Sequence, residues 1–384
     1  MIPRLVSAAA CSFLVLCAAS VQAQVKVGVI VSATGAGASL GSVQKKAVAM
    51  LPTELGGQKV SYIVMDDASD TNQSVKAARK LISDEKVDVL IGSSMSAPSI
   101  ALVDVVAEQK VPLVSMAGSS RITTPVDEKR RWAFKTPFDE ALAIDATLKR
   151  ASASGTKRLG VLATSDAYGD TWTAELNRLK SKYPLEIVAV ERYAPADTTV
   201  LAQAAKVLAA KPDAILVAAS GTPAALPHKT VRERGFKGTV YQTYAALAPE
   251  VYKLGGKDMD GTIAVTSAGF QPDQLDPSNP IRKASALLID KYEALYGKGS
   301  FSSYVGNLWM ASQLVEAAVP EALKTQKPGT PEFRAAIRDQ IERVKGMVTQ
   351  TGYVNMSPTD HVGYDERATG VFEYRNNAWV LLSK

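Results

Sequence analysis

Cysteine is scarce in this chain of 384 residues: it has two, Cys11 and Cys17, and both lie in an apolar segment at the amino terminus. That segment has the organisation of a secretory signal, with one early charge at Arg4, a short apolar run and small or short residues before Gln24. We expect residues 1–23 to be a signal peptide that is cleaved before Gln24. The exported chain would then have no cysteine, which excludes disulfides and thiol chemistry despite an oxidising destination.

Long apolar runs are also missing after this segment, and no later stretch has the length expected of a membrane span. We therefore predict a protein that is free in solution outside the cytoplasm. A lipoprotein anchored at Cys17 is an alternative, but Leu16 is larger than the residue that usually precedes such a cysteine. Charge of one sign is not concentrated either: the net charge of +6 comes from scattered Lys and Arg residues, so no nucleic-acid surface is indicated.

Histidine is equally rare, and neither His228 nor His361 belongs to a metal-binding or hydrolase motif. We interpret both as surface or capping residues, because His228 follows a proline at an expected helix start and His361 follows Asp360 in an expected turn. Asp166 and Asp170 lie near a tyrosine but have no second group for acid–base chemistry. The sequence therefore predicts no metal site, no catalytic residues and no enzyme.

What the chain does contain is a repeated alternation of apolar strands and helical segments. Its length indicates about two domains, and the alternation indicates an α/β fold with parallel, Rossmann-like sheets. Strands are expected at 25–31, 59–65, 87–91, 111–114, 157–163, 185–192 and 214–218, and helices at 42–54, 72–85, 100–109, 171–183 and 199–210.

The stretch 88–120 organises this pattern, because two of its strands each end in a small polar loop. The carboxyl ends of parallel strands meet at one edge of a sheet, where ligands bind in open α/β folds. Ser96 and Ser119 are therefore expected to face one crevice, where hydroxyls and the free N–H groups of a helix start suit a carboxylate. The alternative is that these serines only cap helices and close turns.

A second copy of this layout occurs later in the chain. KPDAILVAASGTPAALPHKTVRERGFKGTVYQT matches KVDVLIGSSMSAPSIALVDVVAEQKVPLVS in the order of strand, Ser-containing loop, helix, basic turn and strand. The step from Ser93 to Ser115 is 22 residues, and the step from Ser220 to Thr243 is 23. Two similar α/β domains are therefore predicted.

The last third of the chain has a different pattern. Helices are expected near 281–296, 303–319 and 333–344, and the alternation at 370–374 and 378–382 indicates a hairpin. We expect the chain to cross between the domains more than once. The predicted division is 24–138 with 269–345 in the first lobe, and 139–268 with 346–384 in the second.

One glycine-rich segment raises an alternative, because Gly35, Gly37 and Gly41 follow a strand and precede an expected helix, as in dinucleotide-binding folds. The last glycine is displaced by one position, and the acids Asp66 and Asp67 come about 30 residues on rather than the expected ~20. We interpret the segment as a flexible crevice loop that lets the backbone approach a ligand. No cofactor is predicted; an exported enzyme that uses a nucleotide cofactor is the remote alternative.

Taken in order, these segments resemble the periplasmic solute-binding proteins of branched-chain amino acid (Leu/Ile/Val) ABC importers. The resemblance covers nearly all of the chain after the signal and rests on VKVGVIVSATGAGASLG, MDDASDTNQSVKAARKLISDEKVDVLIG, the two serine loops and DAYGD. It implies a type I periplasmic binding protein: two α/β lobes joined by a three-strand hinge, with a ligand that closes the cleft between them. It also implies a monomer that delivers a small carboxylate to an ABC permease in the inner membrane, or, alternatively, presents it to a membrane receptor as a sensor.

The resemblance assigns roles at individual positions. Ser96 matches the hydroxyl that holds the ligand carboxylate, and Tyr168 matches a tyrosine of the second lobe that closes on the ligand. The other matched positions are Leu40 against the ligand side chain, Ala117, Gly118 and Ser119 in the loop around its head group, and Ser220 and Thr222 in the second-lobe loop that faces the cleft.

Two features depart from the family pattern. Ser69 and Met95 stand where some members have paired cysteines, which agrees with the expected absence of a disulfide. Tyr244 stands where amino-acid binders place the acid that receives the ligand's ammonium, and a buried ammonium needs a carboxylate or a full set of acceptors. The ligand is therefore either a branched-chain amino acid, with Asp166 as a substitute acceptor, or a related aliphatic or aromatic acid without the amine.

Overall fold

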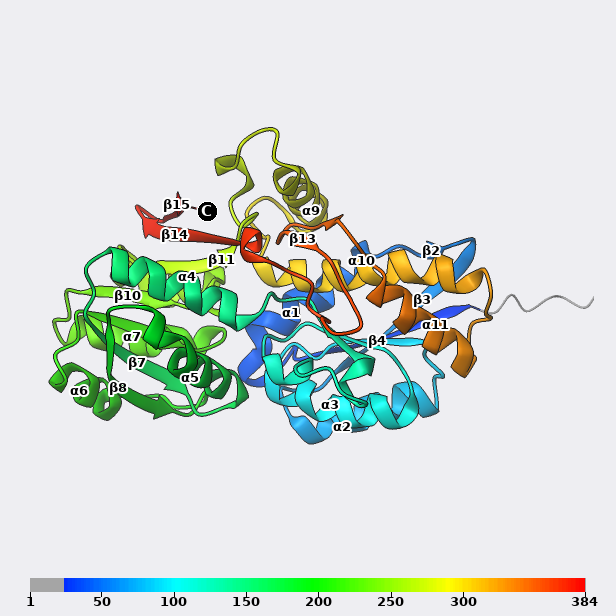
Figure 1. Cartoon of the computed structure of the whole chain (residues 1–384), viewed down its shortest axis with the longest axis horizontal. Helices are drawn as coiled ribbons and strands as arrows, with labels where there is room; N and C mark the ends of the chain where they lie inside the picture. Colours follow the sequence, from blue (N-terminus) through cyan, green and yellow to red (C-terminus); the bar gives the residue numbers. More distant parts are fainter. Residues whose placement is uncertain (1–23, 384) are drawn as a thin grey trace, which may run out of the picture.

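The computed structural model describes residues 24–383, so the predicted signal peptide and the Cys17 alternative lie outside the described residues. The chain forms two α/β lobes that lie side by side, each built around its own sheet (Figure 1). The predicted fold class is therefore confirmed. Within residues 24–383, no helix has the length and apolar character that crossing a membrane requires.

The first lobe has a six-stranded sheet in the order β2-β3-β1-β4-β5-β6, in which every pair is parallel except β2 with β3. Its strands are β1 (Val25–Val31), β2 (Glu54–Leu55), β3 (Gln58–Asp66), β4 (Val89–Ile91), β5 (Leu113–Ser115) and β6 (Ala133–Lys135). Its helices are α1 (Ala38–Ala47), α2 (Thr71–Ser83), α3 (Ser96–Gln109), α9 (Pro280–Tyr296), α10 (Ser303–Leu323) and α11 (Pro331–Glu342).

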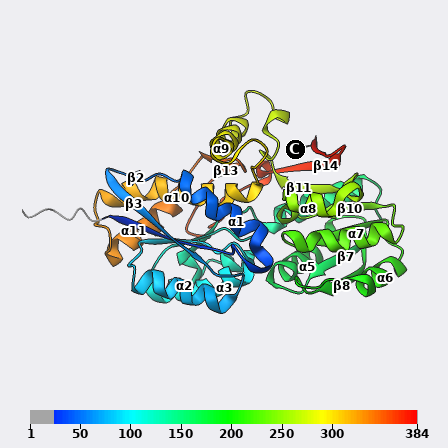
Figure 2. The same ribbon diagram turned by 180° about the vertical axis from the view of Figure 1, so that it is seen from behind.

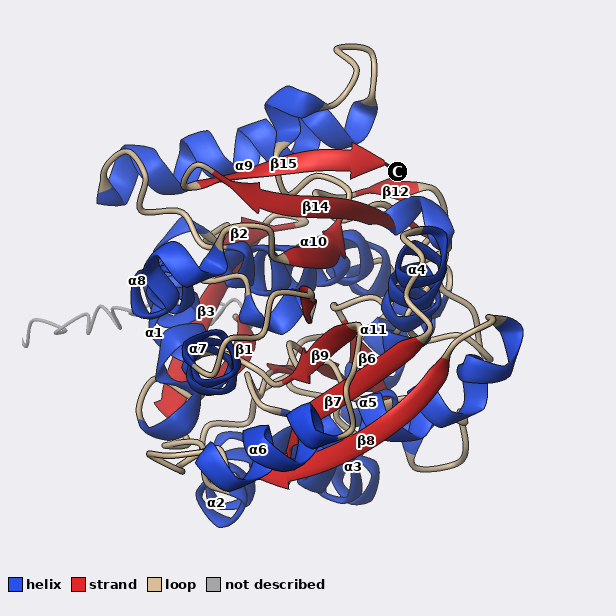
Figure 3. Ribbon diagram, turned by 90° about the vertical axis from the view of Figure 1, so that its left-hand side faces the viewer, coloured by secondary structure: helices blue, strands red, loops and turns tan. Residues whose placement is uncertain are grey.

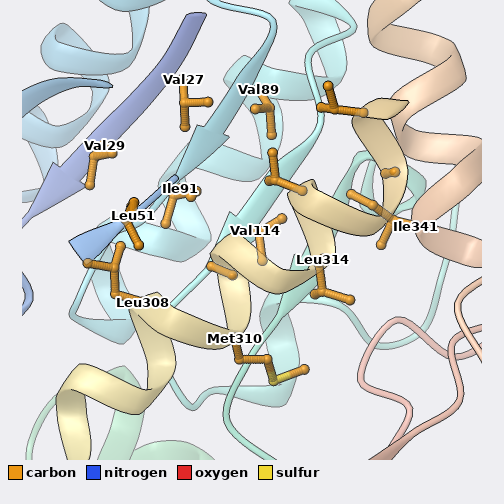
Figure 4. Close-up of a cluster of buried hydrophobic side chains, with 14 of the residues drawn as sticks. Val27, Val29, Leu51, Val89, Ile91, Val114, Leu308, Met310, Leu314 and Ile341 are labelled. Atoms are coloured by element: carbon orange, nitrogen blue, oxygen red, sulfur yellow. The ribbon is translucent and has the colours of Figure 1, made fainter. Parts of the chain in front are cut away.

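The core of the first lobe explains why β1 is a near-continuous apolar run. Val27 and Val29 pack with α10 and α11, whereas Ile30 packs with α2 and α3, and all three are fully buried. A strand that is covered on both faces needs apolar residues at consecutive positions rather than alternating ones. Figure 4 shows the first of these two packing layers, in which Leu308 and Leu314 of α10 cover the strands.

The second lobe has a seven-stranded sheet in the order β15-β14-β11-β10-β9-β7-β8, and the pairs that include β14 are antiparallel. Its strands are β7 (Arg158–Thr164), β8 (Glu186–Tyr193), β9 (Ala214–Ala218), β10 (Thr239–Gln242), β11 (Ile263–Ser267), β14 (Thr369–Arg375) and β15 (Ala378–Ser383). Its helices are α4 (Glu140–Ala153), α5 (Ala167–Leu179), α6 (Leu201–Ala209), α7 (Ala225–Glu233) and α8 (Pro249–Gly255). The predicted terminal hairpin is confirmed, and Figure 3 shows it at one edge of this sheet.

The chain passes between the lobes three times: after β6, after β11, and between α11 and β14 (Figure 2). On the last passage it forms the short pair β12 (Met347–Val348) and β13 (Tyr353–Val354). Val354 and Met356 still pack in the core of the first lobe, so the last crossing takes place after them. The lobe boundaries predicted residue by residue stay a prediction.

Helix α1 begins at Ala38, earlier than the predicted start at residue 42, so the glycine-rich segment is not a flexible loop throughout. Gly41 lies inside this helix, where a Cβ atom would come within 2.2 Å of the carbonyl oxygen of Ser32. Glycine therefore lets the helix pack against the end of β1, which is a packing role. Gly35, by contrast, has a φ of 76° and supplies the turn that precedes the helix.

Both histidines are buried, so their interpretation as surface or capping residues is wrong. His228 Nε2 lies 2.8 Å from the carbonyl oxygen of Asp258, and burial lowers the pKa of His228 to about 4. The ring of His361 stacks on Phe134 with centroids 4.1 Å apart, and its Nδ1 lies 2.9 Å from the carbonyl oxygen of Ala133. Segments distant in the sequence bury these rings, which the neighbouring turn residues do not reveal. Residues 24–383 contain no group of His, Cys, Asp and Glu side chains that could hold a metal ion.

Candidate ligand-binding site

A cavity of about 200 Å³ lies between the two lobes. A single water molecule needs about 10–15 Å³ of such space, so the cavity has room for a small organic molecule. Its walls are mainly apolar with a few polar groups, as is usual for ligand pockets. The first lobe contributes Leu40, Ser94, Met95, Ser96, Ala97, Pro98, Met116 and Gly118, among others, and the second contributes Phe138, Asp166, Tyr168, Ser220, Tyr244 and Ala245.

The start of α3 forms one wall of the cavity. The helix begins at Ser96 and not near residue 100, because the proline at 98 fits the first turn of a helix. The N–H groups of Ser96 and Ala97 belong to this first turn and have no carbonyl partner within the helix. Both residues line the cavity. Together with the positive end of the helix dipole and the Ser96 hydroxyl, they make this wall suitable for a carboxylate.

Buried hydrogen bonds fix the loop that precedes α3. Ser93 Oγ donates to Asp67 Oδ2 at 2.5 Å, and Ser94 Oγ donates to Gln44 Oε1 at 2.6 Å. These acceptors come from the end of β3 and from α1, so two other segments hold the loop in place. The hydroxyls of Ser93 and Ser94 have structural partners, and they provide a rigid support for Ser96.

Aromatic rings of the second lobe form the opposite wall. The centroid of the Tyr244 ring lies 4.8 Å from that of Phe138 and 6.2 Å from that of Tyr168, edge-on in the second case. The hydroxyls of Tyr168 and Tyr244 are buried and form no hydrogen bond with the described residues. Burial raises the pKa of both phenols well above the usual value, so both stay protonated at neutral pH.

A buried ion pair lies next to this wall. Lys135 at the end of β6 and Glu140 at the start of α4 are fully buried, and Lys135 Nζ is 3.2 Å from Glu140 Oε2. Lys135 also donates to the carbonyl oxygen of Gly118, so the pair connects the head-group loop of the first lobe with the crossing into the second. Burial raises the pKa of Glu140 to about 7, although the charge of Lys135 opposes this shift.

The two lobes are in contact across the cleft. Ser119 Oγ and Thr171 Oγ1 of α5 are 2.7 Å apart. Leu40 of α1 is buried and packs with a hydrophobic cluster of the second lobe. At Gly221, where φ is 68°, a Cβ atom would lie 2.8 Å from Leu40 Cδ1. Glycine at this position therefore allows the close approach of the lobes.

Most of the residues predicted for the site line the cavity, namely Leu40, Ser96, Gly118, Tyr168, Ser220 and Tyr244. The others lie beside it. Ser119 faces Thr171, Ala117 is buried and its N–H donates to Ser115 Oγ at 3.1 Å, and Thr222 begins a short 3-10 helix. The roles of all these residues toward a ligand stay predictions.

Several residues at the cavity were not predicted from the sequence. Tyr304 and Asn307 come from α10, and Phe138 comes from the first crossing between the lobes. Glu140 beside the cavity was also not predicted. It lies in the first turn of a helix, where the helix dipole favours any acid, so its position gave no sign of a buried ion pair. The available signal for the ion pair was Lys135, a cation at the end of the otherwise apolar strand β6.

Asp166 is the one acidic side chain that lines the cavity within residues 24–383. Its Oδ1 atom caps α5, because it accepts the N–H of Gly169 at 2.9 Å and the hydroxyl of Thr164 at 2.8 Å. Such caps stabilise a helix start. The suggestion that Asp166 receives a ligand ammonium therefore competes with a structural task.

Comparison with known proteins gives a consistent result. Residues 24–372 match a family model described as periplasmic binding protein. The crystal structure of an extracellular ligand-binding receptor from Rhodopseudomonas palustris HaA2 is 44% identical and covers 94% of this chain and 100% of its own, with a TM-score of 0.91. An ABC-transporter solute-binding protein from R. palustris, solved in complex with benzoate, is 22% identical and covers 94% of this chain and 96% of its own, with a TM-score of 0.79. The Leu/Ile/Val-binding protein homolog 3 of Brucella melitensis is 22% identical over 365 residues, which are 93% of each chain.

Proposed function

This chain belongs to the periplasmic binding protein family, as its resemblance to the Leu/Ile/Val-binding type indicated, and from this premise we propose that it binds a small carboxylate between its lobes. The cavity carries the proposal, because the start of α3 forms one wall and aromatic rings form the other. A carboxylate at the start of α3 would receive the Ser96 hydroxyl and two N–H groups. The apolar body of the ligand would contact Leu40 and Tyr244.

Among carboxylates, we propose an aliphatic or aromatic acid without an α-ammonium. The position of Tyr244 offers a hydroxyl where an amino-acid binder has an acid, and Asp166 is engaged as a helix cap. A buried ammonium without a carboxylate costs several kcal/mol. The benzoate complex of the R. palustris protein supports this choice, because benzoate has no amine. The name of the Brucella relative supports the alternative, a branched-chain amino acid.

The binding cycle that we propose begins outside the cytoplasm, after cleavage before Gln24. The ligand carboxylate docks on Ser96 and on the loop 117–119, and the second lobe closes on it through Tyr168, Ser220 and Tyr244. Closure is a population shift that the additional contacts of the closed state drive. The monomeric protein then delivers the ligand unchanged to an ABC permease in the inner membrane; presentation to a membrane receptor is the alternative.

A thermal-shift screen of residues 24–384 tests this function. The panel contains branched-chain amino acids, their 2-oxo acids, and aromatic acids including benzoate. A ligand that binds only the native state adds about 2.7 kcal/mol at a concentration of 100 times its Kd, which raises the melting temperature. We expect shifts with the amine-free acids. No shift with any acid in the panel would contradict the proposed function, and shifts with the amino acids alone would reverse the choice of ligand class.

Replacing Ser96 with alanine is expected to weaken binding of the best ligand by about ten- to a hundredfold, because hydrogen bonds to charged groups contribute about 1.5–3 kcal/mol. Isothermal titration calorimetry measures the change. Ser120→Ala is the matched control, because Ser120 follows the loop 117–119 and does not line the cavity. If Ser96→Ala left the affinity unchanged, the carboxylate would have to bind elsewhere in the cleft.

A further inference from the structure

Gly118 marks a point at which three side chains converge. A Cβ atom on Gly118 would lie 2.6 Å from Tyr244 Oη and 3.0 Å from Glu140 Oε1. The ring of Tyr168 lies 3.0 Å from the same position. Tyr244 lines the cavity, whereas Glu140 is fully buried. The ring of Tyr244, which lines the cavity, therefore ends in a buried hydroxyl near Glu140, a residue that does not line the cavity.

Two of the converging atoms are polar and have no partner. Tyr244 Oη and Glu140 Oε1 are both buried, and neither forms a hydrogen bond with the described residues. The other carboxyl oxygen of Glu140 receives Lys135 Nζ. Buried polar atoms are costly to leave unpaired, so a movement that brings the Tyr244 hydroxyl within hydrogen-bond distance of Glu140 Oε1 would satisfy both atoms at once.

The direction of this hydrogen bond depends on the charge of Glu140. An ionised carboxylate has only acceptors, so it accepts a hydrogen bond from the Tyr244 hydroxyl, and the phenol oxygen then has only lone pairs to offer a ligand. A protonated Glu140 donates to the phenol oxygen instead, and the hydroxyl of Tyr244 then points its proton at the ligand. The same tyrosine is thus an acceptor in one state and a donor in the other.

We propose that Glu140 is a specificity-determining residue, whose charge, transmitted through the Tyr244 hydroxyl, selects between 2-oxo acids and 2-hydroxy acids. The inference rests on the proposed function, because it names the subclass of carboxylate that the same cleft takes. A 2-oxo group has only acceptors and needs Tyr244 as a donor. A 2-hydroxyl group can donate or accept, so it fits both states.

The charged and titratable side chains around Glu140 are Lys135, Asp139, Tyr168 and Tyr244. Burial raises the pKa of Glu140 to about 7, so the switch between the two states falls near neutral pH. Burial lowers the pKa of His361, whose carbonyl oxygen accepts the N–H of Lys135. The cleft should therefore accept both acids below this pH and favour the 2-hydroxy acid above it.

The test measures Kd by isothermal titration calorimetry for two matched pairs: 4-methyl-2-oxopentanoate with 2-hydroxy-4-methylpentanoate, and phenylpyruvate with phenyllactate. From about pH 6 to about pH 8.5, the wild-type affinity for the 2-oxo acid should fall about tenfold relative to that for its 2-hydroxy partner. A tenfold change is expected if the pKa of Glu140 differs by about one unit between the two complexes. The affinity for the 2-hydroxy acid should change little.

Two variants and a control separate this role from a structural one. Glu140→Gln is neutral and can donate to the phenol oxygen, so its affinity ratio at both pH values should equal the wild-type ratio at about pH 6. Tyr244→Phe leaves the Lys135–Glu140 pair intact and should abolish the pH dependence of the ratio. Asp145→Asn is the control, because it removes a carboxylate from the same helix, whose ion pair with Lys182 is exposed; its ratio should follow the wild type.

The outcomes are distinguishable from a failure of the proposed function. If no acid binds the wild-type protein at either pH, the proposed function fails. If the acids bind but the wild-type ratio does not depend on pH, the role of Glu140 is wrong while the function stands. If Glu140→Gln does not fold, Tyr244→Phe decides: a ratio that still depends on pH in this variant overturns the inference.

Discussion

Replacing Lys135 with methionine is expected to lower the free energy of unfolding by about 3–5 kcal/mol at pH 8, because it leaves Glu140 without its cation in a fully buried position. The carbonyl oxygen of Gly118 loses its donor in the same step. Urea denaturation measures the change. The loss should shrink at pH 5, because Glu140 then becomes protonated and no buried charge remains unpaired.

The sign of this pH dependence follows from the wild type. Burial raises the pKa of Glu140 from 4.5 to about 7, so the folded protein holds the proton that the unfolded chain has lost between these values. Glu140 therefore makes the free energy of unfolding fall as pH rises from 4.5 to about 7. The Lys135→Met variant should extend this fall to higher pH.

The double variant Lys135→Met with Glu140→Leu is the control for this prediction. Replacing both members of a buried pair by apolar residues is often neutral, whereas removing one is costly. The double variant should regain most of the lost stability at pH 8. If it remained as unstable as Lys135→Met alone, the loss would come from packing or from the unpaired carbonyl oxygen of Gly118 rather than from the unpaired carboxylate.

Replacing Gly118 with alanine is expected to weaken ligand binding by about ten- to a hundredfold, because overpacking costs about 1–3 kcal/mol. The new methyl group would lie 2.6 Å from Tyr244 Oη and 3.0 Å from Glu140 Oε1, so both side chains have to move. Gly118 does not have a positive φ, so the substitution brings crowding without backbone strain. Calorimetric titration with the best acid of the screen gives the affinity.

The double variant Gly118→Ala with Tyr244→Phe tests the cause of this loss. Removing the phenol oxygen removes the shortest of the contacts, so the double variant should bind more tightly than Gly118→Ala alone. An affinity of Gly118→Ala equal to that of the wild type would show that the loop 117–119 moves freely and does not shape the head-group site.

The local pattern predicted much of the fold. The valine-rich run of β1 was placed at Val25–Val31, as the structure has it, because a strand buried on both faces is apolar at nearly every position. The start of α1 was misplaced, because small residues suit both a loop and a helix that packs closely, and Gly41 does the latter. Whether this segment forms a loop or a helix depends on the close approach of Gly41 to Ser32. Hydrophobic periodicity does not reveal such a contact.

The cavity was predicted where the sequence repeats a layout, at Ser96 and Ser220, and where a known family supplies positions, at Tyr168 and Tyr244. The Lys135–Glu140 pair was missed because its burial depends on both lobes and on the segment that joins them. Such burial arises only when the whole chain is folded, so the local sequence pattern does not reveal it. The two histidines were misread for the same reason, since their rings are covered by residues distant in the sequence.

The three passages between the lobes also determine when the protein acquires its structure. Val265 pairs with Val371, and Asp88 Oδ1 accepts the N–H of Gly329, so each lobe needs segments from the last part of the chain. Long-range pairing of this kind delays folding, because distant residues must meet before their contacts form. A ribosome has to synthesise nearly all of the polypeptide before either lobe is complete. We therefore expect a chain that lacks these last segments, whether truncated or still being synthesised, to leave both lobes incomplete.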